Sequence, residues 1–218
     1  MRYKLTTQDM LTRKGKANET HWTVGEWVEA SNDCSSGLCS DGYVHWYADS
    51  LLAVLLNPIH ANIDSPRLWE VETGGYEQTD GQLKGGSQKV RLLKEMPLPA
   101  VTVEQRIRFA ILCGQEVYAD AAWNLWADNW LSGKDRTATA ATAAFAAANA
   151  AARDDARDAA AAAADAAYAA AYAAYAAADA AFAAAAAAEP ARAAFAAAYA
   201  ANARADIDLI KLAKEAML

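Results

Sequence analysis

The residues best suited to bind another molecule lie in two short aromatic stretches, "YVHWY" at 43–47 and "RLWE" at 67–70. Rigid aromatic side chains combined with a few charged or hydrogen-bonding groups are the usual means of recognition. An arginine can hold a carboxylate or phosphate through two parallel hydrogen bonds, and a tryptophan can stack on a flat group. The predicted binding residues are Tyr43, His45, Trp46, Tyr47, Arg67, Trp69, Glu70 and Lys84.

The same residues also have an ordinary structural interpretation, which the sequence leaves open. A single histidine between aromatic residues is more often part of a core than a ligand, and tryptophans in strands usually fill the interior. Arg67 can equally close a structural ion pair with Glu70 or Glu72. The two interpretations differ in whether Arg67 is available to meet a partner.

The sequence contains no pattern that specifies catalysis or metal binding. It lacks G-x-S-x-G, H-E-x-x-H and a phosphate-binding loop, and the "LKGG" stretch at 83–86 is too short to form such a loop. Cys34 and Cys39 have a spacing that could serve a metal, but no second pair of ligands follows. With Cys113 the cysteine count is three, an odd number that favours a reducing, intracellular setting. We therefore predict no catalytic residue, no metal and no cofactor.

The composition argues against two classes of partner. The formal net charge is −7, and lysine and arginine occur singly rather than in runs, so we expect no nucleic-acid-binding surface. Outside an alanine-rich tract no uncharged apolar run is long enough to cross a membrane, and aspartate and arginine interrupt the tract itself. We expect neither nucleic acid nor membrane as a partner.

The elements that must position these residues predict an α+β fold, with strands confined to residues before 101 and helices after them. Alternating and β-branched stretches bounded by turn residues predict the strands, and an apolar run capped by Asp49 or Ser50 predicts a helix that stops at Asn57-Pro58. The strands are expected at 2–6, 21–30, 43–48, 67–75 and 88–99. Three parts follow: a small β-rich α+β domain at 1–100, linking helices at 101–133, and an alanine-rich antiparallel helical hairpin or bundle at 134–218.

Helical signals begin immediately after the first domain. Thr102 and Gln105 have the spacing of a capping box, in which each side chain binds the other residue's backbone N–H. Further along, three tryptophans recur at helical spacing and form one stripe, which Gly133 ends. The stripe comprises Trp123, Trp126 and Trp130. We expect it to belong to a core, with a ligand platform as the alternative.

An alanine tract dominates the last third of the chain. From Ala138 to Ala205, 46 of 68 residues are alanine, which predicts helix because alanine has the highest helix propensity. One unbroken helix over 135–188 would span about 80 Å, so a hairpin of two or three helices is favoured. Tyr168 and Tyr172 belong to a stripe of large residues with heptad spacing. The alanine faces either interlock, within one chain or between the copies of a homo-oligomer, or leave the stripe to dock a partner.

The alanine faces have little capacity for recognition. A methyl surface offers no donor, acceptor or charge, so it can set shape and spacing but cannot select a ligand. We therefore expect recognition in the first domain, and we expect the alanine helices to serve as a scaffold.

Several motifs in the first hundred residues resemble an uncharacterised domain found in phages and prophages. "YKLTTQDM", "LCSDGYVHWY", "PRLWEVETGG" and "LLKEMPLP" are similar to the family pattern D-M, G, C-x-x-G-x-H, R-x-x-E-V-E-x-x-G, K and E-I-x-L. Gly42 and His45 stand one residue further apart here than in that pattern. The matching positions are Cys39, Gly42, His45, Arg67, Glu70, Val71, Glu72, Lys84 and Glu95. The stretch from "RIRFAILCGQEVY" into the alanine repeats resembles the helical tails of immunity-type bacterial proteins.

The resemblance implies a setting, the cytoplasm of a host cell, rather than a mechanism. We expect a phage- or prophage-encoded binding protein without enzymatic activity, which counters host defence by sequestering a small signal molecule or by blocking a protein. Its partner would be a host protein or a small nucleotide-like ligand. Two alternatives stay open. One is a virion assembly protein with an alanine spacer, and the other is an enzyme similar to ADP-ribosyltransferases in strand order, with Glu70 or Glu72 as its acidic residue.

Overall fold

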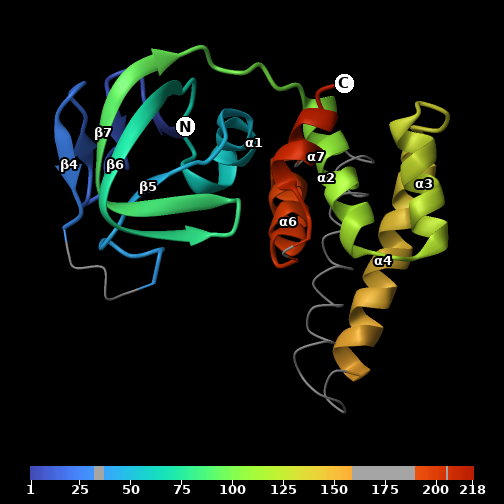
Figure 1. Ribbon diagram of the computed structural model, residues 1–218. Coiled ribbons are helices and arrows are strands. Elements are labelled where there is room, and N and C mark those ends of the chain that lie inside the picture. The colour runs from blue at the N-terminus through green and yellow to red at the C-terminus, as the bar shows by residue number, and fades with distance from the viewer. Residues whose placement is uncertain (32–36, 159–189, 205) are drawn as a thin grey trace. The chain divides into compact units, whose positions relative to one another are not determined.

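The computed structural model describes residues 1–31, 37–158, 190–204 and 206–218. It is a mixed α+β structure made of two compact units, Met1–Ala100 and Val101–Leu218 (Figure 1). In these residues the last strand ends at Met96, and every helix except α1 begins after Thr102. The stripe that contains Tyr168 and Tyr172 lies outside the described residues, and so does much of the expected alanine hairpin.

An antiparallel sheet forms the first unit. Its longest part is a hairpin of two strands, which Figure 1 shows bent around the shorter ones. The strands pair in the order β1 (Arg2–Thr6), β6 (Arg67–Asp80), β7 (Lys84–Met96) and β4 (Trp27–Glu29), with β5 (Val44–Trp46) also on β7, and β2 (Leu11–Thr12) and β3 (Thr20–His21) form a separate hairpin. The glycine pair expected to end β6 does not end it, because Gly75 adopts a φ of 78° within a bulge and the strand continues to Asp80.

The sheet closes on itself through its first strand. The Tyr3 N–H donates to the Tyr47 carbonyl and the Tyr47 N–H donates to the Tyr3 carbonyl, each at 2.8 Å, so β5 reaches back to β1. The strands β1, β6, β7 and β5 therefore form a ring. Its interior contains a hydrophobic cluster of Trp22, Trp46, Trp69, Val71, Val90 and Leu92.

Hydrogen bonds fix the two central indoles of this cluster. Trp69 Nε1 donates to Thr6 Oγ1 at 3.0 Å, and Trp46 Nε1 donates to Ser87 Oγ at 2.7 Å. Buried polar groups are costly unless they are paired, so these bonds allow tryptophan to fill the ring.

Helix α1 (Ser50–His60) follows β5 and packs on β1. Asp49 caps it as predicted, because its carboxylate accepts the N–H groups of Leu51 and Leu52. The predicted stop at Asn57-Pro58 is wrong by one turn. Pro58 lies in the last turn, where its missing N–H removes a single intrahelical bond, and the Asn57 carbonyl accepts from the backbone N–H groups of residues 61 and 62.

The second unit begins with α2 (Val103–Val117), and its start confirms the predicted capping box. The Thr102 hydroxyl accepts from the Gln105 N–H at 3.1 Å, and the Gln105 side chain accepts from the Thr102 N–H at 2.9 Å. Helix α3 (Ala121–Leu131) buries the tryptophan stripe, as the core interpretation predicts. Gly133 follows the helix with a φ of 77°, in the left-handed region that glycine adopts readily.

The alanine-rich helices described are α4 (Ala138–Asp158) and α6 (Pro190–Asn202), and the short α7 (Leu209–Glu215) follows them. Helix α6 packs along α2, and α4 packs against α3. Both use alanine at the contacts, since Ala141, Ala144, Ala148, Ala194, Ala197, Ala198 and Ala201 are buried. These faces therefore contact the helices at 101–133 that the sequence had suggested were a separate linking part.

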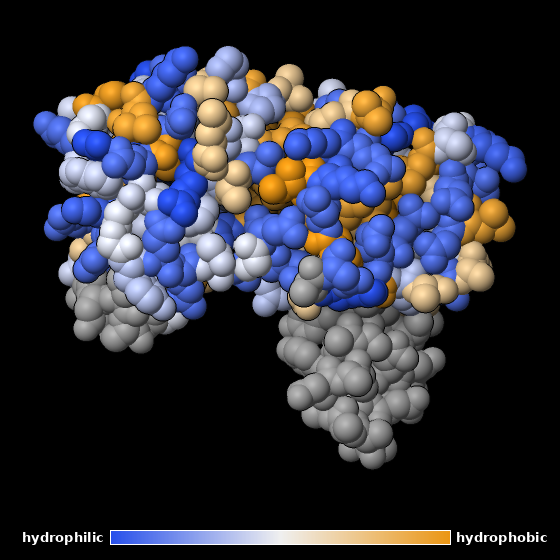
Figure 2. Space-filling model, in the orientation of Figure 1, coloured by the Kyte–Doolittle hydropathy of each residue, from blue (hydrophilic) through white to orange (hydrophobic). Residues whose placement is uncertain are grey.

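Charged and polar residues cover much of the surface. On the face shown in Figure 2, hydrophilic residues predominate over the first unit, and hydrophobic residues form small groups between them. None of the helices in the described ranges is long and apolar enough to span a membrane.

Candidate functional site

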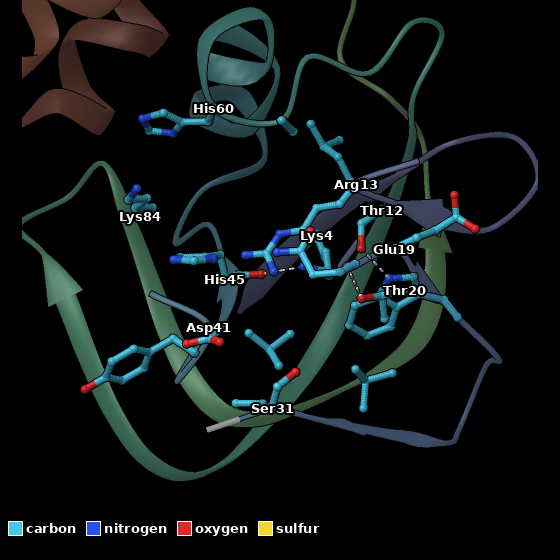
Figure 3. Close-up of a pocket in the computed structure, with 18 of the residues that line it drawn as sticks. Lys4, Thr12, Arg13, Glu19, Thr20, Ser31, Asp41, His45, His60 and Lys84 are labelled. Carbon is cyan, nitrogen blue, oxygen red and sulfur yellow. Dashed lines mark hydrogen bonds between the residues drawn. The ribbon is translucent and has the colours of Figure 1, made fainter. Parts of the chain in front are cut away.

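A cavity of about 420 Å³ lies in the first unit, where β1, the β2–β3 hairpin and β5 meet (Figure 3). Its volume falls within the range of about 300–1,000 Å³ that is typical of small-molecule sites. Four of the eight predicted binding residues line it, namely Tyr43, His45, Tyr47 and Lys84. The other four, Trp46, Arg67, Trp69 and Glu70, do not.

The structure does not support the interpretation of Arg67 as a residue that binds a ligand. The predicted ion pair of Arg67 with Glu70 or Glu72 is wrong. Its guanidinium binds Glu95 through two bonds, Nε to Oε1 at 2.8 Å and Nη2 to Oε2 at 2.6 Å, and lies 4.7 Å from the centre of the Trp69 ring. Glu70 and Glu72 stand three and five residues away on the same strand, and so face the opposite side of the sheet. The partner comes instead from the neighbouring strand β7.

The two glutamates have other surroundings. Glu72 accepts two hydrogen bonds from Arg91, with the shorter at 2.6 Å. Glu70 is opposite Tyr3 on β1. The pKa of the Tyr3 phenol is raised mainly by burial, then by the charge of Asp49, and least by the charge of Glu70. Neither glutamate lines the cavity.

The most unusual lining residue is Lys4, which is not among the predicted ones. Its side chain is on the interior face of β1, and only 8% of the residue is exposed. Nζ donates to the His45 carbonyl at 2.7 Å and lies 4.7 Å from the centre of the Trp22 ring. Burial, and to a smaller extent the nearby charge of Arg13, lower the pKa of Lys4 from 10.5 to about 7.

Arg13 enters the cavity from the turn after β2. Its backbone has a φ of 56°, in the left-handed region, where residues other than glycine are uncommon. Figure 3 shows its guanidinium extending toward Lys4 and His45. Among the described residues it has no hydrogen-bonding or ion-pair partner. Lys84, from β7, lies with Nζ 3.1 Å from the Cys39 sulfur.

The two histidines of the cavity are uncharged near neutral pH. His45 Nε2 lies 2.6 Å from the Leu38 carbonyl, so the ring carries its proton on Nε2 and donates it there. Burial lowers the pKa of His45 from 6.5 to about 4, and burial likewise lowers that of His60 to about 4. The His60 ring stacks on Tyr47, with centroids 5.9 Å apart.

The acidic lining residues Glu19, Glu29 and Asp41 are exposed at the rim. Glu19 accepts the Gly15 N–H at 2.6 Å, a bond within its own loop. The charged side chain in the buried part of the cavity is therefore the cation Lys4.

The burial of His45 predicts a loss of stability in acid. Its folded-state pKa lies below the unfolded value, so its contribution is complete above pH 6.5 and is lost as the pH falls toward 4. Between pH 6.5 and 4.5 we expect the free energy of unfolding to fall by about 1–2 kcal/mol more in the wild type than in His45→Gln. Urea denaturation at several pH values measures this difference, to which His60 contributes equally in both proteins. Parallel curves for the two proteins would contradict the prediction.

A sequence signal for Lys4 exists, although it is incomplete. The strand "RYKLT" places Arg2, Lys4 and Thr6 on one face and Tyr3 and Leu5 on the other. Such a pattern usually indicates a strand with one solvated face. Closure of the ring encloses the polar face instead.

Comparisons of the chain with protein-family models, with curated proteins and with solved structures found no match. The resemblance to a phage domain thus stays a prediction from motifs.

Proposed function

We propose that the protein is a binding protein without enzymatic activity, whose first unit takes up a small, flat anion of the nucleotide type in this cavity. One observation carries the proposal. None of the three cations that line the cavity has an ion-pair partner among the described residues, whereas four of the seven cations elsewhere in the unit each bind a carboxylate. The first group is Lys4, Arg13 and Lys84, and the second is Arg2, Lys14, Arg67 and Arg91.

Aromatic side chains support the choice of a flat ligand. Trp22, Tyr43 and Tyr47 contribute to the lining and are held in place by burial. Aromatic side chains stack on nucleobases whatever the base, and arginine and lysine are the usual ligands of phosphate. The combination is suited to a molecule that joins a planar ring to an anionic group.

The alternative of an ADP-ribosyltransferase-like enzyme gains no support from the cavity. That chemistry would need an acidic residue beside the bound nucleotide. Glu70 and Glu72, the two candidates for it, lie elsewhere on β6.

The biological setting follows from the resemblance. We propose that the protein is phage- or prophage-encoded and acts in the host cytoplasm, where sequestering a signal molecule would counter a host defence. The second unit would serve as the scaffold, with its alanine helices completing an antiparallel bundle. The buried alanine faces of α4 and α6 support this part of the proposal.

Calorimetric titration of the full-length protein tests the proposal. We expect at least one of adenosine 5′-monophosphate, a cyclic dinucleotide and NAD to bind. Arg13→Gln and Lys84→Gln should each weaken binding about tenfold, because each removes one charge-assisted hydrogen bond.

The matched control is Lys94→Gln, which removes a cation from the exposed part of β7 away from the cavity. It should leave binding unchanged. An equal loss in all three variants would show that overall charge matters rather than the cavity, and absence of binding by all three nucleotides would refute the proposed ligand class.

A further inference from the structure

We propose that Lys4 and Arg13 together hold the anionic oxygens of the ligand, and that Lys4 takes up a proton from the solvent as this anion enters. The inference rests on the proposed function, because both concern the same cavity. It adds the subsite, the chemical group bound there, which is an oxyanion of the phosphate or sulfate type, and a dependence of binding on pH.

The ammonium of Lys4 has no carboxylate partner among the described residues. A protonated amine has three N–H bonds, and Nζ meets one protein acceptor among the described residues, the His45 carbonyl. The Trp22 ring also lies beside it. An ammonium that is more than nine-tenths buried is costly unless an anion compensates it, and a ligand oxyanion would supply both the charge and the acceptors.

The surrounding elements supply no compensating carboxylate in the part of the chain that the structure describes. On β6 the residue opposite Lys4 is Trp69, and the charged neighbour on that face, Arg67, is engaged by Glu95. From the turn after β2 comes another cation, Arg13, and from β5 the neutral His45. The remaining charged or titratable groups of the cavity are the exposed carboxylates of the rim and five further side chains, namely Glu19, Glu29 and Asp41, with Cys39, Tyr43, Tyr47, His60 and Lys84.

Arg13 gives the subsite its second point of attachment. Its positive charge lowers the pKa of Lys4, because the two cations repel each other. An oxyanion bound between the two cations would attract both and so offset their mutual repulsion. A guanidinium can offer two parallel N–H groups to such an anion, and Lys4 can add a single charged donor.

The coupling to protons follows from the low pKa of the Lys4 ammonium. Burial and the charge of Arg13 lower its pKa to about 7, so the Lys4 ammonium gives up its proton far more readily near neutral pH than an ordinary lysine does. An anion within 4–6 Å of a titratable group raises the pKa of a cation by about 1–3 units. Binding must then be accompanied by proton uptake at pH 7–9.

Sulfate is a suitable probe, because its charge does not change in this pH range. Full-length protein labelled with 13C at lysine Cε would be titrated from pH 5.5 to 9.5 by NMR, with sulfate or with sodium chloride of equal ionic strength. Loss of one signal in Lys4→Arg assigns the residue. Lys4→Met provides a second assignment should the arginine variant fold poorly.

We expect saturating sulfate to raise the titration midpoint of Lys4 by about one pH unit relative to chloride. The affinity for sulfate should fall by about tenfold in total as the pH rises through the Lys4 midpoints measured in chloride and in sulfate. In Arg13→Gln the midpoint should respond less at the same sulfate concentration. A Lys4 midpoint that is the same in sulfate and in chloride would overturn the inference.

The results also separate this inference from the proposed function. Binding of a nucleotide that leaves the Lys4 midpoint unchanged would refute the subsite and retain the ligand class. A sulfate-dependent shift in a protein that binds none of the nucleotides would support the subsite and reject the nucleotide.

Discussion

At pH 7 we expect Lys4→Met to be more stable than the wild type, with a free energy of unfolding about 2 kcal/mol larger. The wild-type side chain places a cation in the interior without a counter-charge, and methionine retains a flexible chain of similar length beside Trp22 without the charge. The same change should abolish the response to sulfate. A residue that destabilises the empty protein would thus be retained for binding.

The dependence on pH identifies the cause of this stabilisation. The folded-state pKa of Lys4, about 7, lies below the unfolded value of 10.5, so between these values the unfolded chain binds more protons. From pH 7 to 9 the stability of the wild type should therefore rise, by up to about 1.4 kcal/mol per pH unit relative to Lys4→Met. Burial raises the pKa of Tyr47, which opposes this trend only above pH 10.

Urea denaturation at pH 6, 7, 8 and 9 measures both effects. Lys94→Met, on the exposed part of β7, is the matched control and should show the slope of the wild type. If Lys4→Met is less stable than the wild type at every pH, the ammonium contributes to the fold and the inferred cost of its burial is wrong.

Gly85→Ala is expected to lower the free energy of unfolding by about 3 kcal/mol, because it forces a methyl group into a filled interior. A Cβ at this position would lie 2.3 Å from Cζ2 of Trp46. The indole cannot easily retreat, since Ser87 holds its Nε1 at 2.7 Å and the Arg2 guanidinium lies 4.5 Å from the ring centre. Trp46 and Gly85 are direct cross-strand partners, so the clash would weaken the β5–β7 pairing that closes the ring.

Gly37→Ala is the control, because a Cβ there meets no atom within 4 Å and the backbone has no positive φ. Its effect should stay below about 0.5 kcal/mol. Trp46→Leu combined with Gly85→Ala should cost less than the sum of the two single changes, because the smaller side chain leaves room for the methyl group. Additive losses would mean that the clash is relieved elsewhere.

Local signals in the sequence predicted local structure well. The capping box at Thr102 joins residues three positions apart, and the tryptophan stripe of α3 follows from helical spacing alone. Three of the predicted binding residues that line the cavity, Tyr43, His45 and Tyr47, come from "YVHWY", which carries both its strand and its aromatic character in five consecutive positions.

Features that depend on distant pairing were not predictable in this way. Arg67 has a partner 28 residues along the chain, and only the register of β6 against β7 brings Glu95 to it. The burial of Lys4 depends on two further pairings, those of β1 with β6 and with β5. Propensity and periodicity describe one strand at a time, and neither contains the information that the ring closes.

The position of β1 in this ring also bears on the order of folding. Arg2 pairs with Val71, and Tyr3 bridges to Tyr47, so β1 leaves the ribosome before its partners and must wait until most of the unit has been synthesised. Contacts of such long sequence separation form slowly, because a large loop must close before they are made. The cavity around Lys4 therefore belongs to the last stage of folding of its unit, since Lys84 completes its lining only after β7 has emerged.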